Sequence, residues 1–338
     1  MTDWQTEYRS LEKHVLDFIE NRAGVFEELA LEVFRFQRQF NEPFRQFCEY
    51  NGVPESLDNW EKIPAVPQQA FKLSRLTTFP HSAAIREFRT SGTTGEGYGS
   101  HFFADLTLYE AAISAGWNHA GLPHFPAYCL TPNPSDAPHS SLAHMMGRFS
   151  KRFFIEHGAL KSGRLRSELG TEDRPVMLLG TALAFLNWME RENAPMPLPP
   201  GSLVMETGGY KGSGRMLEKA AFYDQLAEFF ALPAKSLVNE YGMTELSSQF
   251  YARGVGNPHR GGPWIRFRVI DPATGQPVAP GERGVLQLFD LANVGSAVAI
   301  LTEDLAQDLG DEGFLLLGRD PAAVARGCSR AVDEMLGR

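Results

Sequence analysis

A run of small hydroxyl residues between glycines is the part of this sequence best suited to phosphate chemistry. Glycines let the backbone approach an anion closely, and hydroxyl and amide groups can donate hydrogen bonds to it. The run matches neither a Walker loop nor a dinucleotide fingerprint, because no lysine follows it and its glycine spacing is wrong. It predicts either a phosphate-binding loop or a flexible solvated loop. Its members are Thr90, Ser91, Gly92, Thr93, Thr94 and Gly95.

A second polar run, from Asn239 to Glu245, directly follows a predicted buried strand. In an α/β sheet, ligands bind outside the C-terminal ends of the strands. The Thr244 hydroxyl and the Glu245 carboxylate can there contact a phosphate and its magnesium ion. The alternative interpretation is an ordinary strand exit in which Thr244 acts only as a cap.

The elements that must position these runs alternate between strand and helix from residue 175 onward. This alternation is typical of an α/β sheet. Thr181 and Ser140 are expected to cap helices, because each precedes a helical pattern with a side-chain oxygen. The predicted strands are 127–130, 175–180, 202–207 and 236–242, and the predicted helices are 106–121, 140–150, 181–190 and 215–231.

The flanking segments have different patterns. Residues 85–103 have a strand, loop and strand pattern in which the hydroxyl run is the loop. Residues 4–21 and 24–50 have helical periodicity with a Phe-rich face that predicts core, and Pro43 is expected to start a new helix. From residue 264 onward, short strands separated by turns predict a small β lobe. We therefore expect three segments: a helical arm (1–60), an α/β core (61–262) and a small β lobe with a C-terminal helix (263–338).

Composition excludes several classes of protein. The chain has 338 residues, of which 43% are hydrophobic and 22% charged, and this predicts a folded protein. A formal net charge of −9 argues against a nucleic-acid binder. Cys48, Cys129 and Cys328 are far apart, so they predict neither a disulfide framework nor a metal motif. The sequence has no leader pattern and no long apolar stretch, so we expect a cytoplasmic protein without a membrane span.

Taken in order, the motifs resemble those of the adenylate-forming superfamily, which includes acyl-CoA synthetases, firefly-type luciferases and peptide-synthetase adenylation domains. The hydroxyl run and the Tyr241–Glu245 segment resemble two of its motifs. Thr302-Glu303-Asp304 resembles its Thr-Gly-Asp, Gly318-Arg319 its Gly-Arg, and Arg326-Gly327 the Arg-Gly that follows. Several spaced matches are more specific than any single one.

Within that superfamily the sequence is most similar to the acyl-protein synthetase family, the LuxE type. The blocks that carry this resemblance are IPAVPQQAFK, FRTSGTTG, SSLAHMM, ETGGYKGSGR, NEYGMTE and LGRDPAAVARGCS. The resemblance implies an α/β fold like the N-terminal domain of adenylate-forming enzymes, with a small β lobe and without most of the mobile C-terminal domain. It also implies two half-reactions. ATP and a carboxylic acid give an acyl-adenylate and pyrophosphate, and the acyl group then moves to a thiol.

The resemblance assigns roles to individual residues, with ATP and Mg²⁺ as the implied cofactors. Ser91, Thr93, Thr94 and Gly95 would hold the ATP phosphates, and Thr244 would bind the α-phosphate. Glu245 would hold the magnesium ion, while Asp304 and Arg319 would orient the ribose. Gly208 and Gly209 would line the adenine, and Gly92, Tyr241 and Gly242 complete the expected nucleotide site.

Lys211 is a candidate to replace a lysine that the resembling enzymes have and this sequence lacks. Larger adenylate-forming enzymes neutralise charge with a lysine in the mobile C-terminal domain, and the hydroxyl run here also lacks the usual Pro-Lys. Lys211 lies in a Gly-rich turn after a predicted strand, so it can reach a phosphate as a point charge. The alternative is a solvent-exposed turn lysine.

Cys328 is the candidate acyl acceptor. Arg326 and Arg330 flank it, and nearby positive charge lowers the pKa of a thiol. A thiolate at this position can attack an acyl-adenylate directly. The alternative is a structural cysteine, and we interpret Cys48 and Cys129 as core residues.

The acid is expected to bind near the SSLAHMM block, where Ser141, His144 and Met145 are candidates. His144 can equally be a helix-packing or surface residue. Two other functions stay open. The chain can be an acyl- or aryl-CoA ligase with coenzyme A as the acceptor, or a catalytically weakened binding protein that holds an acyl-adenylate or nucleotide for a partner.

Overall fold

The computed structural model describes residues 4–90, 97–192, 194–208 and 217–319. The chain divides into two units. Unit 1 comprises Met1–Ala120, Met243–Gln249 and Arg260–Arg338, and unit 2 comprises Gly121–Gly242 and Phe250–His259. The three-segment organisation expected from the sequence stays a prediction.

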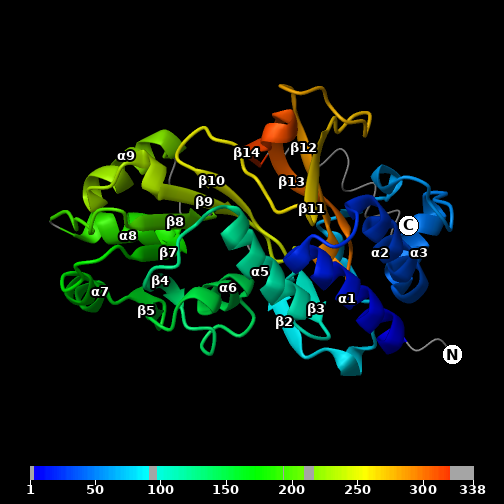
Figure 1. Cartoon of the computed structure of the whole chain (residues 1–338), viewed down its shortest axis with the longest axis horizontal. Coiled ribbons are helices and arrows are strands. Elements are labelled where there is room, and N and C mark those ends of the chain that lie inside the picture. Colours follow the sequence, from blue (N-terminus) through cyan, green and yellow to red (C-terminus); the bar gives the residue numbers. More distant parts are fainter. Residues whose placement is uncertain (1–3, 91–96, 193, 209–216, 320–338) are drawn as a thin grey trace. The chain divides into compact units, whose positions relative to one another are not determined.

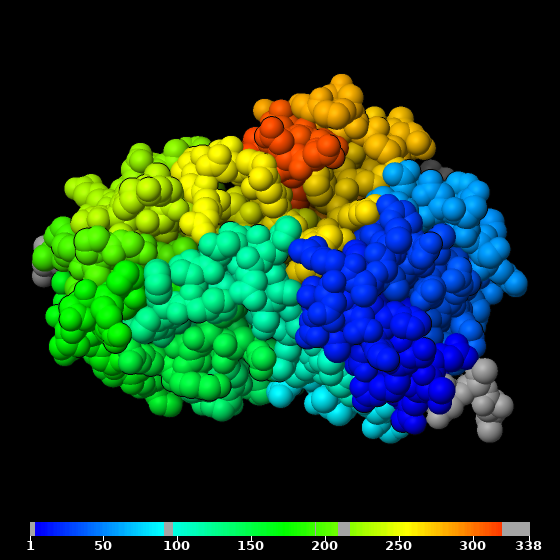
Figure 2. Space-filling view, viewed as in Figure 1, coloured from blue at the N-terminus to red at the C-terminus, as the bar shows by residue number. Residues whose placement is uncertain are grey.

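Unit 1 begins with three helices, α1 (Trp4–Asn21), α2 (Phe26–Phe40) and α3 (Glu42–Tyr50). Asn41 caps α3 by accepting a hydrogen bond from the Phe44 amide at 3.3 Å, and Pro43 lies in its first turn, as predicted. These helices form the blue part of the surface in Figure 2, while their aromatic stripe is covered. The Phe-rich face is therefore core, with buried members Phe18, Phe26, Phe34, Phe36, Phe44 and Phe47.

A five-stranded sheet forms the second part of unit 1. Its order is β1-β13-β12-β11, and β14 also pairs with β13, along a later part of that strand than β1 does (Figure 1). The strands predicted after residue 264 are all present, and β1 joins them by pairing in parallel with β13. The bounds are Val66–Pro67 for β1, Ile265–Ile270 for β11, Arg283–Asp290 for β12, Ala299–Asp308 for β13 and Phe314–Arg319 for β14.

A hairpin completes unit 1 and confirms the two strands predicted within residues 85–103, while residues 91–96 of the predicted loop lie outside the described residues. Strands β2 (Arg86–Arg89) and β3 (Ser100–Phe103) pair in antiparallel fashion, and α5 (Thr107–His119) follows them. Helix α5 packs against α1. The short elements of unit 1 are α4 (Ala70–Leu73), η1 (Trp60–Lys62), η2 (His81–Ala83), η4 (Leu291–Asn293) and η5 (Gly310–Glu312).

Unit 2 is an α/β sheet of seven strands in the order β10-β9-β8-β7-β4-β5-β6. The five central strands are parallel, and β10 and β6 are antiparallel edges. The predicted α/β fold is thus confirmed for this part of the chain. The strands are β4 (Ala127–Pro132), β5 (Phe153–Glu156), β6 (Ala159–Leu160), β7 (Met177–Thr181), β8 (Leu203–Thr207), β9 (Leu237–Tyr241) and β10 (Phe250–Arg253).

Two helices of unit 2, α6 and α8, start at the side-chain caps that the sequence predicts. Ser140 accepts from the Ala143 amide and Thr181 from the Ala184 amide, both at 3.1 Å. The last helix begins at Lys219 rather than near residue 215, and the described residues just before it are not helical. The helices are α6 (Ser141–Phe149), α7 (Ser162–Leu169), α8 (Ala182–Arg191) and α9 (Lys219–Phe230), with η3 at Ala234–Ser236.

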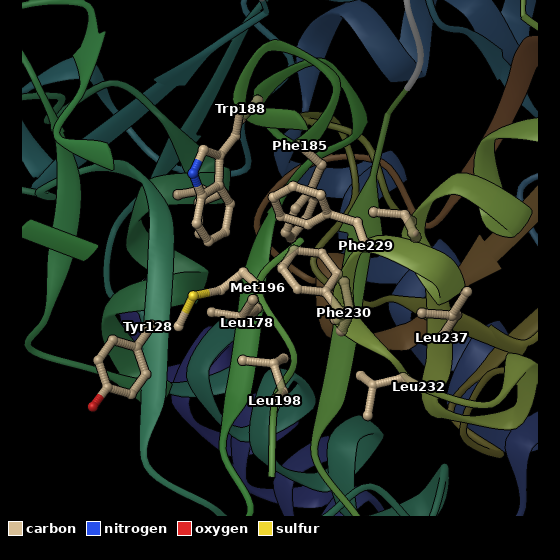
Figure 3. Close-up of a cluster of buried hydrophobic side chains, with 14 of the residues drawn as sticks. Tyr128, Leu178, Phe185, Trp188, Met196, Leu198, Phe229, Phe230, Leu232 and Leu237 are labelled. Atoms are coloured by element: carbon tan, nitrogen blue, oxygen red, sulfur yellow. The ribbon is translucent and has the colours of Figure 1, made fainter. Parts of the chain in front are cut away.

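An aromatic cluster fixes α8 and α9 to the sheet of unit 2. The rings of Phe229 and Phe230 each lie 5.6 Å from the Trp188 ring, and Figure 3 shows these side chains turned toward one another beside Phe185. Burying such rings contributes roughly 2 kcal/mol each from apolar area alone. Leu178 of β7, Val204 of β8 and Leu237 of β9 belong to the same buried cluster, so the two helices pack on the strands whose C-terminal ends carry site candidates. No helix in the ranges that the structure describes is long and apolar enough to cross a membrane.

Candidate functional site

The predicted site residues are distributed over both units. Unit 1 contains Thr244, Glu245, Asp304 and Arg319, and unit 2 contains the remaining described candidates. The candidates outside the described residues are Ser91, Gly92, Thr93, Thr94, Gly95, Gly209, Lys211 and Cys328.

Glu245 is the most deeply buried acid among these candidates. Its side chain is buried, and Oε1 accepts a hydrogen bond from Nε2 of Gln68 at 3.1 Å. Its other oxygen, Oε2, has no hydrogen-bond partner among the described residues. Burial raises the pKa of Glu245 to about 7, because a carboxylate loses its hydration there. A cation beside the free oxygen would restore the charged form.

The segment that carries Glu245 is anchored by residues that the sequence analysis missed. Buried Asp290 accepts from the amides of Ser247 at 2.9 Å and Ser248 at 2.8 Å, and Asn293 donates to the Glu245 backbone oxygen at 2.9 Å. Burial raises the pKa of Asp290 to about 6, although these donors oppose the shift. The available signal was an acid at the end of a predicted strand, followed three residues later by an asparagine.

Thr244 is tied to the hairpin of unit 1. Its backbone oxygen lies 2.9 Å from Nδ1 of His101 on β3, and its hydroxyl lies 3.5 Å from the backbone oxygen of Arg89 on β2. Burial lowers the pKa of His101 to about 4, so the ring is neutral and its Nδ1–H donates to Thr244. The chain therefore enters the hydroxyl run from a strand end that lies beside Thr244.

Asp304 and Arg319 are brought together by the sheet of unit 1. They are direct partners in the β13–β14 register, and Nε of Arg319 donates to Oδ1 of Asp304 at 3.1 Å. Nη1 of the same guanidinium lies 3.6 Å from Oε2 of Glu303. Glu303 in turn accepts from Nε2 of Gln69 at 2.8 Å. The arginine is thus held by two neighbouring carboxylates.

The surroundings of Glu245 fit a magnesium ion. Its Oε2 and the amide oxygen of Gln68 are both buried without a hydrogen-bond partner in the described part of the chain. Carboxylate and carbonyl oxygens are the ligands that Mg²⁺ prefers. The described residues contain no group of three or more His, Cys, Asp or Glu side chains that could hold a metal. An ion here would therefore depend on phosphate oxygens and water for its other ligands, as Mg²⁺ commonly does.

In unit 2, Gly208 and the Tyr241–Gly242 pair lie at the C-terminal ends of two neighbouring strands. Their strands β8 and β9 are parallel neighbours with Thr207 opposite Glu240. The Thr207 hydroxyl donates to Oε2 of Glu240, and burial raises the pKa of Glu240 to about 7. Gly208 has a φ of +77°, which favours glycine, so it can turn the chain as it leaves β8.

A buried polar network lies one residue back along the same strands. Nδ2 of Asn239 donates to Oε1 of Glu206 at 2.8 Å, and its Oδ1 lies 2.5 Å from Nζ of Lys219 and 2.7 Å from Nε2 of His259. Burial raises the pKa of Glu206, although Lys219 opposes the shift. This network fixes the Asn239 amide in one orientation. Its sequence signal was the acid within each of two predicted buried strands, at Glu206 and Glu240.

Ser141, His144 and Met145 lie on α6, at helical spacing that places them on neighbouring positions. Met145 is buried, whereas Ser141 and His144 are half-buried.

Both described cysteines are core residues, as predicted. Cys48 and Cys129 are fully buried. Burial raises the pKa of Cys48 to about 11 and that of Cys129 to about 12. Thiols this basic are poor nucleophiles at neutral pH. Neither is therefore a candidate acyl acceptor.

Comparison with solved structures defines the class of fold. Two structures of 2-hydroxyisobutyryl-CoA ligase align with 87% of this chain. One, in the thioesterification state with an acyl-adenylate and CoA, aligns over 68% of its length with a TM-score of 0.64 and 19% identity. The other, an open conformation, aligns over 69% of its length with a TM-score of 0.62 and 17% identity. The fold is that of the adenylate-forming ligases, as predicted.

The family model of the acyl-protein synthetases, LuxE, matches residues 164–337, just over half of the chain. The chain belongs to this family. Two relatives named long-chain-fatty-acid–luciferin-component ligase are each 22% identical. The Aliivibrio fischeri protein aligns over 85% of this chain and 80% of its own length, and the Vibrio harveyi protein over 83% and 78%. The predicted family and the predicted ligase class, acid activation as an acyl-adenylate with transfer to a thiol, are confirmed.

Proposed function

We propose that this protein uses ATP and Mg²⁺ to activate a fatty acid or another acyl acid, and then transfers the acyl group to its own Cys328 for hand-over to a partner protein. The observation that carries the proposal is the buried Glu245 carboxylate, which keeps one oxygen free of described partners. We further propose that the protein works in the cytoplasm.

The nucleotide would be held mainly by unit 1 in the first half-reaction. Residues 91–95 would hold the phosphates, with the Thr244 hydroxyl on the α-phosphate and Glu245 on the magnesium ion. The bound ion would screen the negative charge that otherwise repels the incoming carboxylate. Asp304 would accept hydrogen bonds from the ribose hydroxyls while Arg319 stays aligned beside it, at the 3.1 Å distance it already has.

The candidates for adenine contacts follow strands β8 and β9. Gly208 and Gly209 would allow close approach of the base, and Tyr241 and Gly242 would line it from the neighbouring strand. Parallel pairing of β8 and β9 supports this proposal, because it brings Gly208 and Gly242 to the same sheet edge. We propose that Lys211, which follows β8 in sequence, supplies the positive charge for the phosphates.

The second half-reaction transfers the acyl group to sulfur. The Cys328 thiolate would attack the acyl carbonyl carbon, forming a carbon–sulfur bond. The bond from that carbon to the adenylate oxygen would break, and AMP would leave with the electron pair. Arg326 and Arg330 flank the thiol in sequence and would favour the thiolate.

The acid is proposed to bind along α6, with Ser141, His144 and Met145 as candidate contacts. Two relatives carry names that specify a long-chain fatty acid, which supports an aliphatic acyl chain as the first substrate to test. Met145 would give the pocket an adaptable apolar wall.

Acid-dependent exchange of pyrophosphate into ATP tests the first half-reaction, across short, aromatic and long-chain acids. Exchange with at least one acid is expected, and its absence with every acid would leave the binding-protein alternative. Intact mass after incubation with that acid and ATP tests the second step. The wild type and Cys48→Ala should gain one acyl mass, and Cys328→Ala should not. Coenzyme A-dependent AMP release by Cys328→Ala would instead identify a CoA ligase.

A further inference from the structure

Two successive glutamines, Gln68 and Gln69, leave the sheet of unit 1 directly beside the acidic residues of the candidate site. Strand β1 pairs in parallel with β13 in the register Val66–Ile300 and Pro67–Leu301. The Gln68 amide extends this pairing by donating to the Leu301 backbone oxygen at 2.9 Å. This pairing brings Gln68 beside the segment that begins at Thr302, and Gln69 follows it in the turn before α4.

Each glutamine reaches a different acid. Gln68 donates its Nε2–H to Oε1 of Glu245 at 3.1 Å, and Gln69 donates its Nε2–H to Oε1 of Glu303 at 2.8 Å. Both glutamines lie in the turn between β1 and α4, where Gln69 already has helical backbone angles, and their two contacts show that adjacent residues here serve separate groups. Neither acid lies near the glutamines in sequence, and only the fold brings them together.

The contact of Gln68 selects which oxygen of Glu245 is free. Oε1 is occupied by the amide donor, and Oε2 has no partner among the described residues. The amide oxygen of Gln68 is likewise buried without a described partner. An amide that donates to one carboxylate oxygen restricts the orientation of the carboxylate, and its own oxygen belongs to the same planar amide group as the donor.

The contact of Gln69 acts on the arginine through Glu303. Glu303 stands where the resembling Thr-Gly-Asp motif has glycine, so its side chain is an addition to that motif. Oε2 of Glu303 lies 3.6 Å from Nη1 of Arg319, while Gln69 holds its Oε1. Gln69 thereby limits the positions that Glu303, and with it the Arg319 guanidinium, can take.

We propose that Gln68 and Gln69 are two separate positioning residues of the nucleotide site. Gln68 orients the Glu245 carboxylate toward a divalent cation and offers its amide oxygen to the same cation, and Gln69 orients Arg319 through Glu303 toward the ribose. The proposal rests on the proposed function, since it needs a nucleotide and Mg²⁺ at this site. It differs from a purely structural role because the two side chains affect different parts of the ligand.

Calorimetric titration of the full chain with two probes tests this separation. AMP without metal reports the ribose side. ATP at a series of MgCl₂ concentrations reports the cation side. The variants are Gln68→Met and Gln69→Met, which keep side-chain length and remove the amide. Gln46→Met is the matched control, because Gln46 donates to Glu42 at 3.4 Å on the exposed face of α3.

Gln68→Met should raise the Mg²⁺ concentration for half-maximal ATP binding by roughly tenfold or more, with AMP affinity unchanged, since loss of an outer partner weakens metal binding by about that factor. Gln69→Met should weaken AMP binding roughly tenfold, with the Mg²⁺ requirement unchanged, as expected for loss of a hydrogen bond to a charged group. Gln46→Met should match the wild type in both titrations. If Gln68→Met folds poorly by circular dichroism, Gln68→Ala replaces it with the same expectation.

Two results would overturn the proposal while leaving the proposed function intact. The first is that the wild type binds both probes and that both glutamine variants bind them with the wild-type affinity. The other is equal weakening of both probes by both variants, which indicates only a structural role. A wild type that binds neither AMP nor Mg²⁺-ATP would instead overturn the proposed function, and this inference with it.

Discussion

Nδ1 of His101 donates a hydrogen bond to the backbone oxygen of Thr244 at 2.9 Å, and this contact joins the hairpin of unit 1 to the segment that carries Glu245. The imidazole is buried between the rings of Phe71 and Phe103, at 5.7 Å and 4.2 Å between centroids. A neutral buried histidine is therefore part of the framework that holds Thr244.

Replacing His101 by Phe should leave the Thr244 carbonyl without its donor. We expect the free energy of unfolding to fall by about 1–3 kcal/mol, which is the cost of one unsatisfied buried group. ATP affinity should also fall, because Thr244 is proposed to contact the α-phosphate. His101→Asn is the matched variant, because its amide nitrogen can take the position of Nδ1. Urea unfolding and ATP titration check both quantities, and the prediction is wrong if Asn is no better tolerated than Phe.

Glu245→Ala should abolish the proposed cation site and reduce pyrophosphate exchange by roughly 100-fold or more, a typical cost for losing one electrostatic group in an active site. Glu245→Gln keeps the shape of the side chain and should lose nearly as much, since the amide lacks the charge. Glu55→Ala, at an exposed position of unit 1, is the control. Exchange that survives Glu245→Ala at the wild-type rate would show that Glu245 does not hold the ion.

Asp304 and Arg319 should act as a coupled pair in AMP binding. We expect Asp304→Asn and Arg319→Met each to weaken AMP binding roughly tenfold, as for lost hydrogen bonds to charged groups. The double variant should lose less than the sum of the two, with a coupling free energy of about 0.5 kcal/mol or more. The exposed pair Arg164–Glu156, at 2.7 Å in unit 2, is the control. The same double-mutant cycle at this pair should leave AMP affinity unchanged. Strict additivity at Asp304 and Arg319 would contradict the prediction.

The stability of unit 1 should depend on the protonation of Glu12. Burial raises the pKa of Glu12 from 4.5 to about 7, and neighbouring Asp105 adds to the shift while Arg9 opposes it. The folded protein therefore holds a proton on Glu12 that the unfolded chain releases above pH 4.5. This contribution to the free energy of unfolding is fully present below pH 4.5 and is lost as the pH rises through about 7.

Urea unfolding at a series of pH values checks this dependence. Glu12→Gln should remove that part of the decline between pH 4.5 and 7, because an amide does not titrate. Glu20→Gln, exposed on the same helix, should leave the wild-type profile. Identical profiles for Glu12→Gln and the wild type would contradict the assignment.

Local signals in the sequence predicted most of the fold. Helix caps at Ser140 and Thr181, the Phe stripe of α2 and the paired strands β2 and β3 depend on neighbours close in sequence, so spacing alone reveals them. Pairing of β1 with β13 was not predicted. A two-residue strand gives no periodicity, and its partner lies more than 200 residues away in sequence.

The candidate site was predictable only in part. The Asp304–Arg319 pair could be inferred because each residue belongs to a recognisable motif, and the antiparallel register then sets them opposite each other. Gln68 belongs to the block IPAVPQQAFK, which indicated no role for it, and Asp290 belongs to no motif named above. Their importance comes from buried acceptors and donors in segments 177 and 42 residues away, and single-sequence periodicity carries no information about such contacts. His101 was missed for the same reason, since its partner is a backbone oxygen.

The side chain of Gln37 on α2 donates to the backbone oxygens of Asn293 at 2.8 Å and Val294 at 3.2 Å, and its own oxygen accepts from the Val298 amide at 2.9 Å. One helix near the start of the chain thus completes the hydrogen bonding of a loop about 256 positions later, and Asn293 in that loop also holds the Glu245 backbone. Opening of α2 must therefore expose the loop amides as well. Helix α2 and the Glu245 segment should therefore exchange their amide hydrogens as one cooperative unit. A substitution that destabilises α2 should also increase hydrogen exchange in the Glu245 segment.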